Sequence, residues 1–292
     1  MVKVSIVIPN WNGRKLLEKN LPSVLATKPA EVIVVDDASP DNSNEFLEKN
    51  YPQIKIVKHK KNLGFAVSCN DGVEAAQSEV IALLNLDVVP EKDLLEFVLP
   101  HFQDPKVFAV SFHEPAWSWA KISWRKGFIE HEPGPKTKKA HISAWASGGS
   151  AAFRKDIWES LGGFDEIYYP FYWEDVDLGY RAWKRGYKIM WEPKAIVHHK
   201  HEAIIGKHFS KEYIDFISER NRLLFIWKNI TDFKMIMKHK LWCLWKLRSL
   251  GFWKPFLAAK VKLPLILLRK IKGWQDTKVS DSEIFKIFAK FT

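Results

Sequence analysis

Three carboxylates occupy four consecutive positions within the stretch FYWEDVDLGYR, residues 171–181. Glu174, Asp175 and Asp177 follow a run of aromatic residues and open a segment with helical spacing. Neighbouring carboxylates raise one another's cost of ionisation, and burial raises it further, so one of them could take a proton from a substrate. Acids in the first turn of a surface helix would form the same pattern, because negative charge suits the helix dipole there. The stretch alone is compatible with both interpretations.

The elements that must position these acids are indicated by the first part of the chain. Five short runs rich in Val and Ile are predicted as strands buried on both faces, at residues 4–9, 31–37, 54–59, 79–87 and 107–112. The segments between them are predicted as helices, at residues 14–27, 41–50, 66–77 and 91–102. This alternation indicates an α/β domain with a mainly parallel sheet covered by helices.

Polar clusters stand at the ends of three of these strands. PNWNG follows the first strand, DDAS follows the second, and NLD closes the fourth. A single acid at such a position often caps the next helix. Because ligands of open parallel sheets bind at the carboxyl ends of the strands, the three clusters together predict a ligand site at this edge.

The middle of the chain is less regular. Residues 113–141 mix Trp, Pro, Gly and Lys without a clear period and are predicted as a long loop near the substrate. A short helix is expected within residues 146–166, with paired glycines on both sides. Gly148 and Gly149 would let the backbone approach a ligand closely, although a tight turn needs the same residue type.

Composition excludes several classes of protein. The only cysteines, Cys69 and Cys243, lie far apart and without metal-ligand spacing, which indicates a reducing compartment rather than a disulfide scaffold. The first residues have no extended apolar region typical of a secretory signal. No run approaches the roughly 20 apolar residues of a spanning helix.

The net charge of +11 is concentrated in one segment, because residues 207–272 contain 16 Lys or Arg and 4 Asp or Glu. This contrast predicts a catalytic domain at 1–206 and a basic, aromatic-rich helical region at 207–292. Basic residues alternate there with Leu, Trp and Phe at near-helical spacing, with breaks expected at Pro255 and Pro264. Such a region fits the surface of an anionic membrane. A helical subdomain packed on the catalytic domain is the alternative.

Six motifs occur in a characteristic order, namely VSIVIPNWNG, VVDDAS, NLGFAVSCNDG, LLNLD, GGFDE and WEDVDLGYR. Together they resemble the family 2 glycosyltransferases over about residues 3–206, and NLGFAVSCN with LLNLD is most similar to the non-processive, rhamnosyltransferase-like branch. The resemblance implies a Rossmann-like, nucleotide-sugar-binding glycosyltransferase A fold and an inverting single displacement. The Gln-x-x-Arg-Trp motif of processive synthases is absent, which favours addition of a single sugar.

The resemblance also implies a nucleotide-sugar site. It maps a nucleobase contact onto Asp37, with Asp36 beside it, because a carboxylate there can accept from a ring N–H of the base. The donor would carry UDP, dTDP or GDP. The residues assigned to this site are Pro9, Asn10, Asn12, Asp36, Asp37, Asn62, Gly64, Asn70, Asn85 and Leu86.

A divalent cation, Mg²⁺ or Mn²⁺, is expected at the NLD motif, which stands where the family usually carries Asp-x-Asp. Asp87 is the expected ligand, and Asn85 replaces the first acid. One carboxylate is chemically sufficient because Mg²⁺ is commonly held by one or two carboxylates together with substrate phosphates. His199 is the best candidate for a further ligand, with His198 and His201 as alternatives.

The resemblance places the catalytic base in the Glu-Asp pair, and we assign it to Asp175. The residues expected to hold the acceptor or support the base are Glu174, Asp177, Trp173, Gly148 and Gly149. Arg181 is expected to pair with Asp177 across one helical turn. A glycan or lipid-linked acceptor in cell-envelope synthesis would suit a cytoplasmic protein attached peripherally to the plasma membrane.

Three other functions agree less well with the motifs. A sugar nucleotidyltransferase needs a Gly-rich phosphate loop after the first strand, whereas IPNWNGRKL offers one glycine. A nucleic-acid-binding protein would use the basic segment but leaves the acidic motifs unexplained, so no nucleic-acid partner is expected. A glycoside hydrolase could use two carboxylates but would need no nucleobase pocket.

Overall fold

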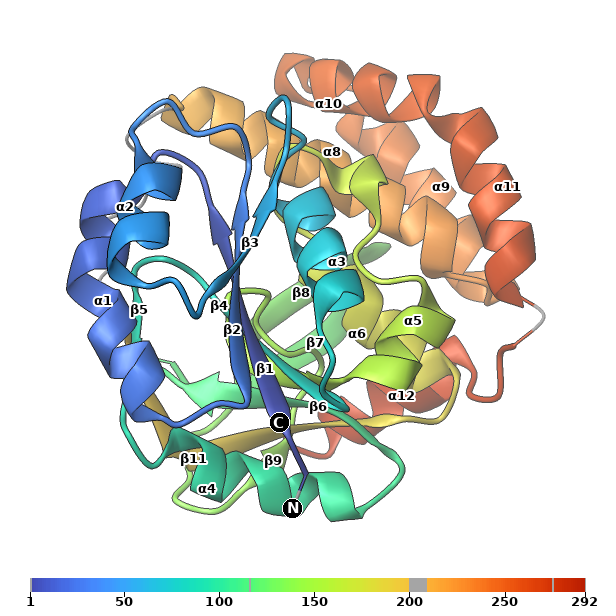
Figure 1. The fold of residues 1–292 in the computed structure, drawn as a ribbon. Coiled ribbons are helices and arrows are strands. Elements are labelled where there is room, and N and C mark those ends of the chain that lie inside the picture. The colour runs from blue at the N-terminus through green and yellow to red at the C-terminus, as the bar shows by residue number, and fades with distance from the viewer. Residues whose placement is uncertain (1, 116, 200–208, 275, 292) are drawn as a thin grey trace.

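A twisted, mainly parallel sheet forms the centre of the computed structural model, which describes residues 2–115, 117–199, 209–274 and 276–291 (Figure 1). Along one path its strands run in the order β3-β2-β1-β4-β10-β6-β11-β5, and β9 pairs with β11. The bounds are β1 Val4–Asn10, β2 Glu31–Asp36, β3 Lys55–Lys58, β4 Val80–Leu84, β5 Val88–Pro90, β6 Val107–His113, β9 His141–Ile142, β10 Ser150–Arg154 and β11 Lys188–His199. The predicted α/β architecture is confirmed.

Helices cover both faces of this sheet, and its strands are therefore buried on both sides. Their bounds are α1 Arg14–Ala26, α2 Ser43–Asn50, α3 Phe65–Ala75, α4 Leu94–Val98, α5 Lys155–Leu161 and α6 Glu174–Lys184, with 3₁₀ turns η1 Leu99–Gln103 and η2 Glu166–Tyr168. Apolar residues of α1, α2 and α4 pack on one face, and those of α3, α5 and α6 contribute to the core on the other. The expected helix at 91–102 is thus divided into α4 and η1.

The strand order brings the predicted polar clusters to one edge of the sheet. Strands β1 and β2 are parallel and align Asn10 with Asp36, and β1 is also parallel to β4. Strand β10 enters between β4 and β6 in the antiparallel direction. Its first residues therefore lie beside the end of β4, where the NLD motif turns.

The prediction of a long loop at 113–141 is wrong in part. Strands β7 Ala120–Arg125 and β8 Phe128–Pro133 form an antiparallel hairpin within it. The turn consists of Lys126 and Gly127, both with positive φ, which is the geometry that two-residue hairpins favour. A Lys-Gly pair is a weaker turn signal than Asn-Gly, so the hairpin was missed.

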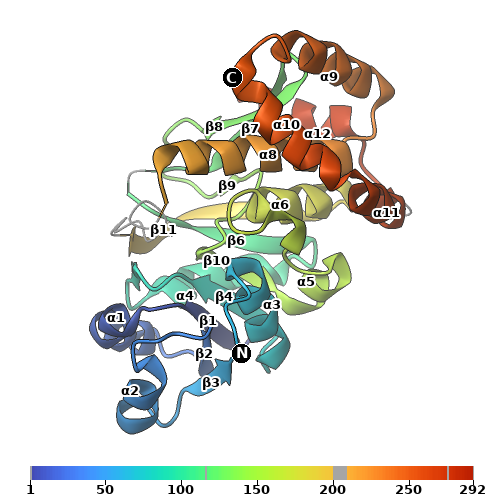
Figure 2. The same cartoon turned by 90° about the horizontal axis from the view of Figure 1, so that it is seen from above.

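The C-terminal part is entirely helical within the described residues, with α8 Lys211–Asn229, α9 Phe233–Lys246, α10 Leu250–Val261, α11 Leu263–Trp274 and α12 Asp281–Ala289. These helices lie on the side of the molecule away from α1 and α2 (Figure 2). The break expected at Pro255 is wrong, because this residue lies inside α10. Pro264 is the second residue of α11, where a proline costs no intrahelical hydrogen bond.

Candidate active site

The ends of β1 and β2 are tied together by side chains. Asn10 Nδ2 donates to Asp36 Oδ1 at 2.7 Å and to Ser39 Oγ at 3.1 Å. The backbone N–H of Asn12, a residue with φ of 55°, also donates to Ser39 Oγ. Asp36 accepts a further hydrogen bond from Asn44 Nδ2 at 2.8 Å. The PNWNG and DDAS motifs therefore form one continuous surface next to Pro9.

Asp37 holds the loop between β3 and α3. Its two carboxylate oxygens accept from the backbone N–H groups of Leu63 and Gly64 at 2.7 and 2.8 Å, and His59 Nδ1 lies 2.8 Å from Oδ1. The loop contains Asn62, which is exposed. In this structure Asp37 orders the start of NLGFAVSCN, and its predicted nucleobase contact stays a prediction.

Asn70 connects α3 to the GGFDE motif. Its side-chain amide donates to the carbonyl of Phe164 and accepts from the Phe164 N–H, both at 2.9 Å. The residue thus holds two predicted motifs together, and its assigned contact with the donor stays a prediction.

The NLD turn packs directly on the start of β10. The Asn85 N–H donates to the carbonyl of Gly149 at 2.8 Å, and a Cβ on Gly149 would lie 2.1 Å from the Asn85 side chain. Leu86 is buried, and its carbonyl accepts from Asn20 at 2.6 Å. Glycine is therefore required at 149 by this close approach.

Asp87 and His199 lie together although 112 residues separate them. His199 Nε2 is 3.1 Å from Asp87 Oδ1, and its Nδ1 is 3.2 Å from Glu114 Oε2. Burial lowers the pKa of His199, but hydrogen bonds and charges from the two carboxylates outweigh it and raise the pKa to about 9. The cluster therefore attracts positive charge. His198 instead lies 3.2 Å from Glu91, and His201 is outside the described residues.

Asp175 lies near the same turn at the start of α6. Its Oδ2 accepts from the Gly148 N–H at 3.3 Å, and its Oδ1 accepts from the Val176 N–H at 2.8 Å. Asp175 is half-buried, and burial raises its pKa. Glu174 is buried, and burial followed by the charge of Asp175 raises its pKa to about 8. Residues 148–149 thus connect Asp175 with the NLD turn.

Asp177 faces the interior instead. It is fully buried and accepts from Tyr168 Oη, Arg181 Nε, Lys228 Nζ and Asn229 Nδ2 at 2.7 to 2.8 Å. Burial alone would raise its pKa, but the charges of Arg181 and Lys228 outweigh that effect and hold the pKa well below its usual range. The expected pairing with Arg181 is confirmed, and Asp177 supports the helix rather than lining a cavity.

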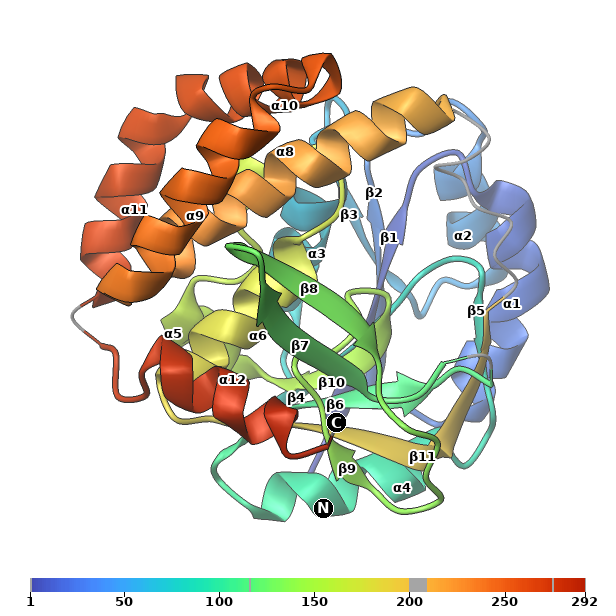
Figure 3. The ribbon, with the colours of Figure 1, turned by 180° about the vertical axis from the view of Figure 1, so that it is seen from behind.

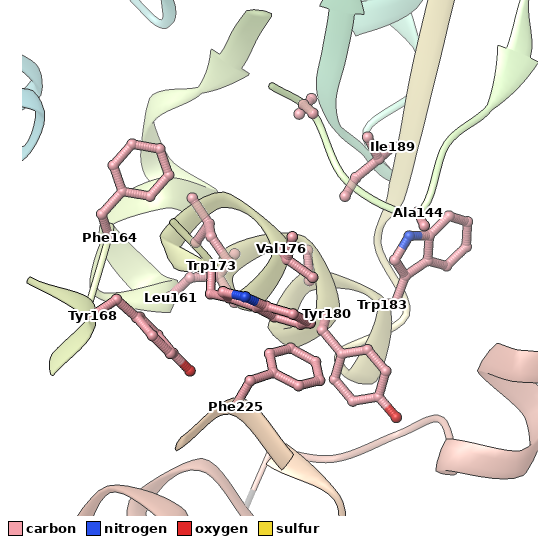
Figure 4. Close-up of a cluster of buried hydrophobic side chains, with 14 of the residues drawn as sticks. Ala144, Leu161, Phe164, Tyr168, Trp173, Val176, Tyr180, Trp183, Ile189 and Phe225 are labelled. Atoms are coloured by element: carbon pink, nitrogen blue, oxygen red, sulfur yellow. The ribbon is translucent and has the colours of Figure 1, made fainter. Parts of the chain in front are cut away.

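Helix α8 holds the backbone that leads into α6. Asn221 Nδ2 donates to the carbonyls of Tyr168, Phe171 and Tyr172 at 2.7 to 2.9 Å. Tyr172 and Trp173 both have positive φ, a conformation that bulky residues rarely adopt. Figure 4 shows Trp173, the residue before α6, and Tyr180 of α6 facing Phe225 of α8. No sequence motif indicated this role for Asn221.

A hollow of about 470 Å³ lies beside the Asp87–His199 cluster. Its lining includes His199, Glu114, Trp117, His131, Trp145, Ser147 and Ser150. Glu114 was not among the predicted site residues, although it lies two residues after the fifth predicted strand and directly after β6. Ser150 Oγ donates to Glu114 Oε1 at 2.7 Å. The aromatic lining and adjacent carboxylates suit a sugar-sized polar molecule.

The model of one protein family, described as glycosyl transferase family 2, matches residues 5–162, which is more than half of the chain. The chain belongs to glycosyl transferase family 2. The match includes the strand ends and the NLD turn, whereas α6 lies beyond its limit. The prediction of a glycosyltransferase is therefore confirmed at the level of the family.

Similar proteins agree with this assignment. A pre-mycofactocin glycosyltransferase of Mycobacterium tuberculosis is 29% identical over 68% of this chain, which spans 43% of that relative. The N-acetylglucosaminyl-diphospho-decaprenol L-rhamnosyltransferase of the same organism is 25% identical over 74% of this chain and 84% of the relative. The predicted similarity to a rhamnosyltransferase-like branch is confirmed by this second relative.

Solved structures show the fold. A structure of GalNAc-T7 with UDP, GalNAc and Mn²⁺ matches with a TM-score of 0.62 at 16% identity, over 77% of this chain and 48% of that one. The mannosyltransferase PcManGT of Pyrobaculum calidifontis, in complex with GDP-Man and Mn²⁺, matches with a TM-score of 0.56 at 18% identity. The match covers 93% of this chain and 74% of that one. The predicted glycosyltransferase A fold is confirmed.

Proposed function

We propose that the chain transfers a single sugar from a nucleotide-sugar donor to a hydroxyl of an acceptor, with inversion at the anomeric carbon. The observation that carries this proposal is the connection from the NLD turn through residues 148–149 to Asp175. This connection links the Asp87–His199 cluster, which attracts positive charge, with the half-buried carboxylate of Asp175. Transfer needs both, since charge must be neutralised on the leaving diphosphate while a base takes the acceptor proton.

Asp175 is the proposed base. The N–H groups of Gly148 and Val176 orient its carboxylate, and the acceptor oxygen would lose its proton to Asp175 as it attacks the anomeric carbon. A carboxylate whose pKa burial has raised is a stronger base than one in water. Attack opposite the leaving diphosphate is a single displacement and therefore inverts the configuration.

Asp87 and His199 would hold the divalent cation. A carboxylate oxygen and an imidazole nitrogen suit Mn²⁺ or Mg²⁺, and Glu114 on the second ring nitrogen would orient His199. Among the described residues no cluster of three or more His, Cys, Asp or Glu is arranged as a complete metal site. Diphosphate oxygens would therefore complete the ligand set. When bound, the cation neutralises the charge on the leaving group.

The surface formed by the ends of β1 and β2 is the proposed nucleotide site. Asn10, Asn12 and Asp36 are joined there by hydrogen bonds, and Asp37 fixes the loop that carries Asn62 and Gly64. The solved structures of similar fold contain UDP or GDP-Man, which supports a UDP-, dTDP- or GDP-sugar donor.

A glycan or lipid-linked acceptor of the cell envelope is proposed for the hollow beside His199. The rhamnosyltransferase relative is named for a diphospho-decaprenol acceptor, and another relative is a poly-beta-1,6-N-acetyl-D-glucosamine synthase of Staphylococcus aureus. That synthase is 26% identical over 66% of this chain and 48% of its own length. Such acceptors would place the enzyme at the cytoplasmic face of the plasma membrane.

A donor panel tests the proposal. UDP-, GDP- and dTDP-sugars are offered with and without Mn²⁺ or Mg²⁺, and binding and slow donor hydrolysis are measured. We expect one nucleotide class to bind and to require the cation, with binding weakened in Asp87→Asn. The variant Asp156→Asn, an exposed acid in the first turn of α5 and outside the proposed donor and cation sites, is the control. Absence of a response to every donor would overturn the proposal.

A further inference from the structure

Three successive C-terminal helices expose apolar side chains in rows. The exposed residues are Phe233, Met237, Leu241, Leu244 and Trp245 on α9, Trp253, Leu257 and Val261 on α10, and Leu265, Leu267, Leu268 and Ile271 on α11. Most are separated by three or four positions, so they share one side of their helix. Isolated exposed apolar residues are common on soluble surfaces, whereas rows of them on three successive helices indicate an interaction surface.

The same helices are strongly basic. Residues 233–274 contain 11 Lys or Arg and no Asp or Glu. The basic side chains exposed to solvent are Lys234, Lys238, Lys240, Arg248, Lys254 and Lys260. Apolar rows with basic residues beside them are the pattern of helices that lie in the interface of an anionic bilayer.

Two other occupants fit this surface less well. A second copy related by a two-fold axis would place the basic surface against itself, and no acid within 233–274 offsets the repulsion. Nucleic acid would match the charge, but a phosphate backbone offers nothing to the exposed Leu, Val and Ile side chains. The hydrocarbon boundary of a bilayer accommodates both features.

We propose that α9, α10 and α11 form a docking face that rests on an anionic lipid bilayer. Figures 1 and 3 show these helices together at one corner of the molecule, outside α8. In the described part of the chain no helix is both long and apolar enough to cross a membrane, so the helices would lie in the plane of the interface.

The docking face is joined to the candidate active site. Lys262 Nζ donates to the carbonyl of Ile167 at 2.8 Å, and Arg269 forms an ion pair with Asp165. Both contacts reach the segment that leads into α6. Docking would thus act on the segment that precedes the proposed base, and any benefit to transfer rests on the proposed function, because it supposes a lipid-linked acceptor.

Vesicle sedimentation of the full chain tests the docking face. Vesicles of phosphatidylcholine, with and without phosphatidylglycerol, are compared at low and high salt. We expect binding only with the anionic lipid and weakening by salt. The variant Lys234→Gln/Lys238→Gln/Lys240→Gln should bind about a hundredfold more weakly, since each basic residue near the surface adds about 1 kcal/mol. Leu241→Ser/Leu244→Ser should also weaken binding.

The control is Lys15→Gln/Lys19→Gln/Lys49→Gln, which removes three exposed charges from α1 and α2 and should bind as the wild type does. The proposal would be overturned if the wild-type chain did not bind anionic vesicles, or if the control and test variants bound them equally weakly. It would also be overturned if the apolar substitutions only dissociated a dimer. So would tight duplex binding without vesicle binding. Donor hydrolysis needs no vesicle, so a failure of the proposed function is seen separately.

Discussion

The two sides of helix α6 place the same chemical group in opposite surroundings. On the site side, Asp175 and Glu174 have few compensating charges, and burial raises their pKa values. On the side that faces α8, Asp177 is more deeply buried but has a lowered pKa, because Arg181 and Lys228 reach it. Burial alone therefore does not decide whether a carboxylate can serve as a base, and the neighbouring cations do.

This difference separates the proposed base, Asp175, from the structural carboxylate of Asp177. Asp175 has no cation among the causes of its pKa shift and retains access to solvent. Asp177 satisfies its oxygens with four side chains and fixes α6 against α8. We expect substitutions on the two sides to affect different measurements, namely rate on the site side and stability on the α8 side.

The largest effect is expected from Asp175→Asn. Loss of the proposed base should lower kcat by about a thousandfold, within the range usual for general-base catalysis, while the unfolding midpoint changes little. The measurement is the rate of transfer with the donor identified by the panel. Donor binding serves as the control for a folded site. Near-normal transfer by a well-folded variant would show that Asp175 is not the base.

The second prediction concerns Asp177→Leu. It removes the carboxylate that the buried Lys228 ammonium shares with the Arg181 guanidinium and leaves Asp165 as the remaining acid partner of Lys228, which should cost about 3 kcal/mol in the free energy of unfolding. Denaturant unfolding measures this loss. The double variant Asp177→Leu/Lys228→Met should recover part of it, because the buried ammonium is removed. Unchanged stability of the single variant would mean that the ion cluster does not hold α6 to α8.

The third prediction is a pH dependence from Glu174. Its pKa is about 8 in the folded chain and about 4.3 in an unfolded one, so the folded state binds more protons between these values. The free energy of unfolding should therefore fall as pH rises through this window. In Glu174→Gln this fall should be reduced, and the variant should gain stability relative to the wild type from pH 5 to 8. Parallel pH profiles would contradict the assignment.

The sequence predicted those parts of the fold that local pattern determines. Strands β1, β2 and β4 are recognisable because both faces are buried, and the strand ends identified Asp36 and Asp87. Glu114 follows the end of β6 by the same rule, but it belongs to none of the six motifs from which the site residues were assigned, so it was not predicted. The β7–β8 hairpin was not predicted because its Lys126-Gly127 turn is a weak turn signal.

Asn221 could not be predicted from the sequence. It lies in the basic C-terminal segment, where composition suggested a membrane surface, and its partners are backbone carbonyls about 50 residues earlier in the chain. Composition likewise could not distinguish α8, which packs on the site, from α9, α10 and α11, which expose apolar rows. Both distinctions depend on contacts made only after folding.

The smallest effect is expected from Asn221→Ala, which tests whether α8 positions the base from a distance. Three carbonyls lose a shared donor, so the free energy of unfolding should fall by about 1–3 kcal/mol. If Asn221 also fixes the strained backbone at Tyr172 and Trp173, kcat should fall while KM for the donor stays unchanged, because the proposed donor site lies at the strand ends. The matched control is Asn50→Ala, which removes a single exposed bond to the Phe46 carbonyl. A loss of stability without any change in kcat would restrict Asn221 to a structural role and leave the two sides of α6 independent.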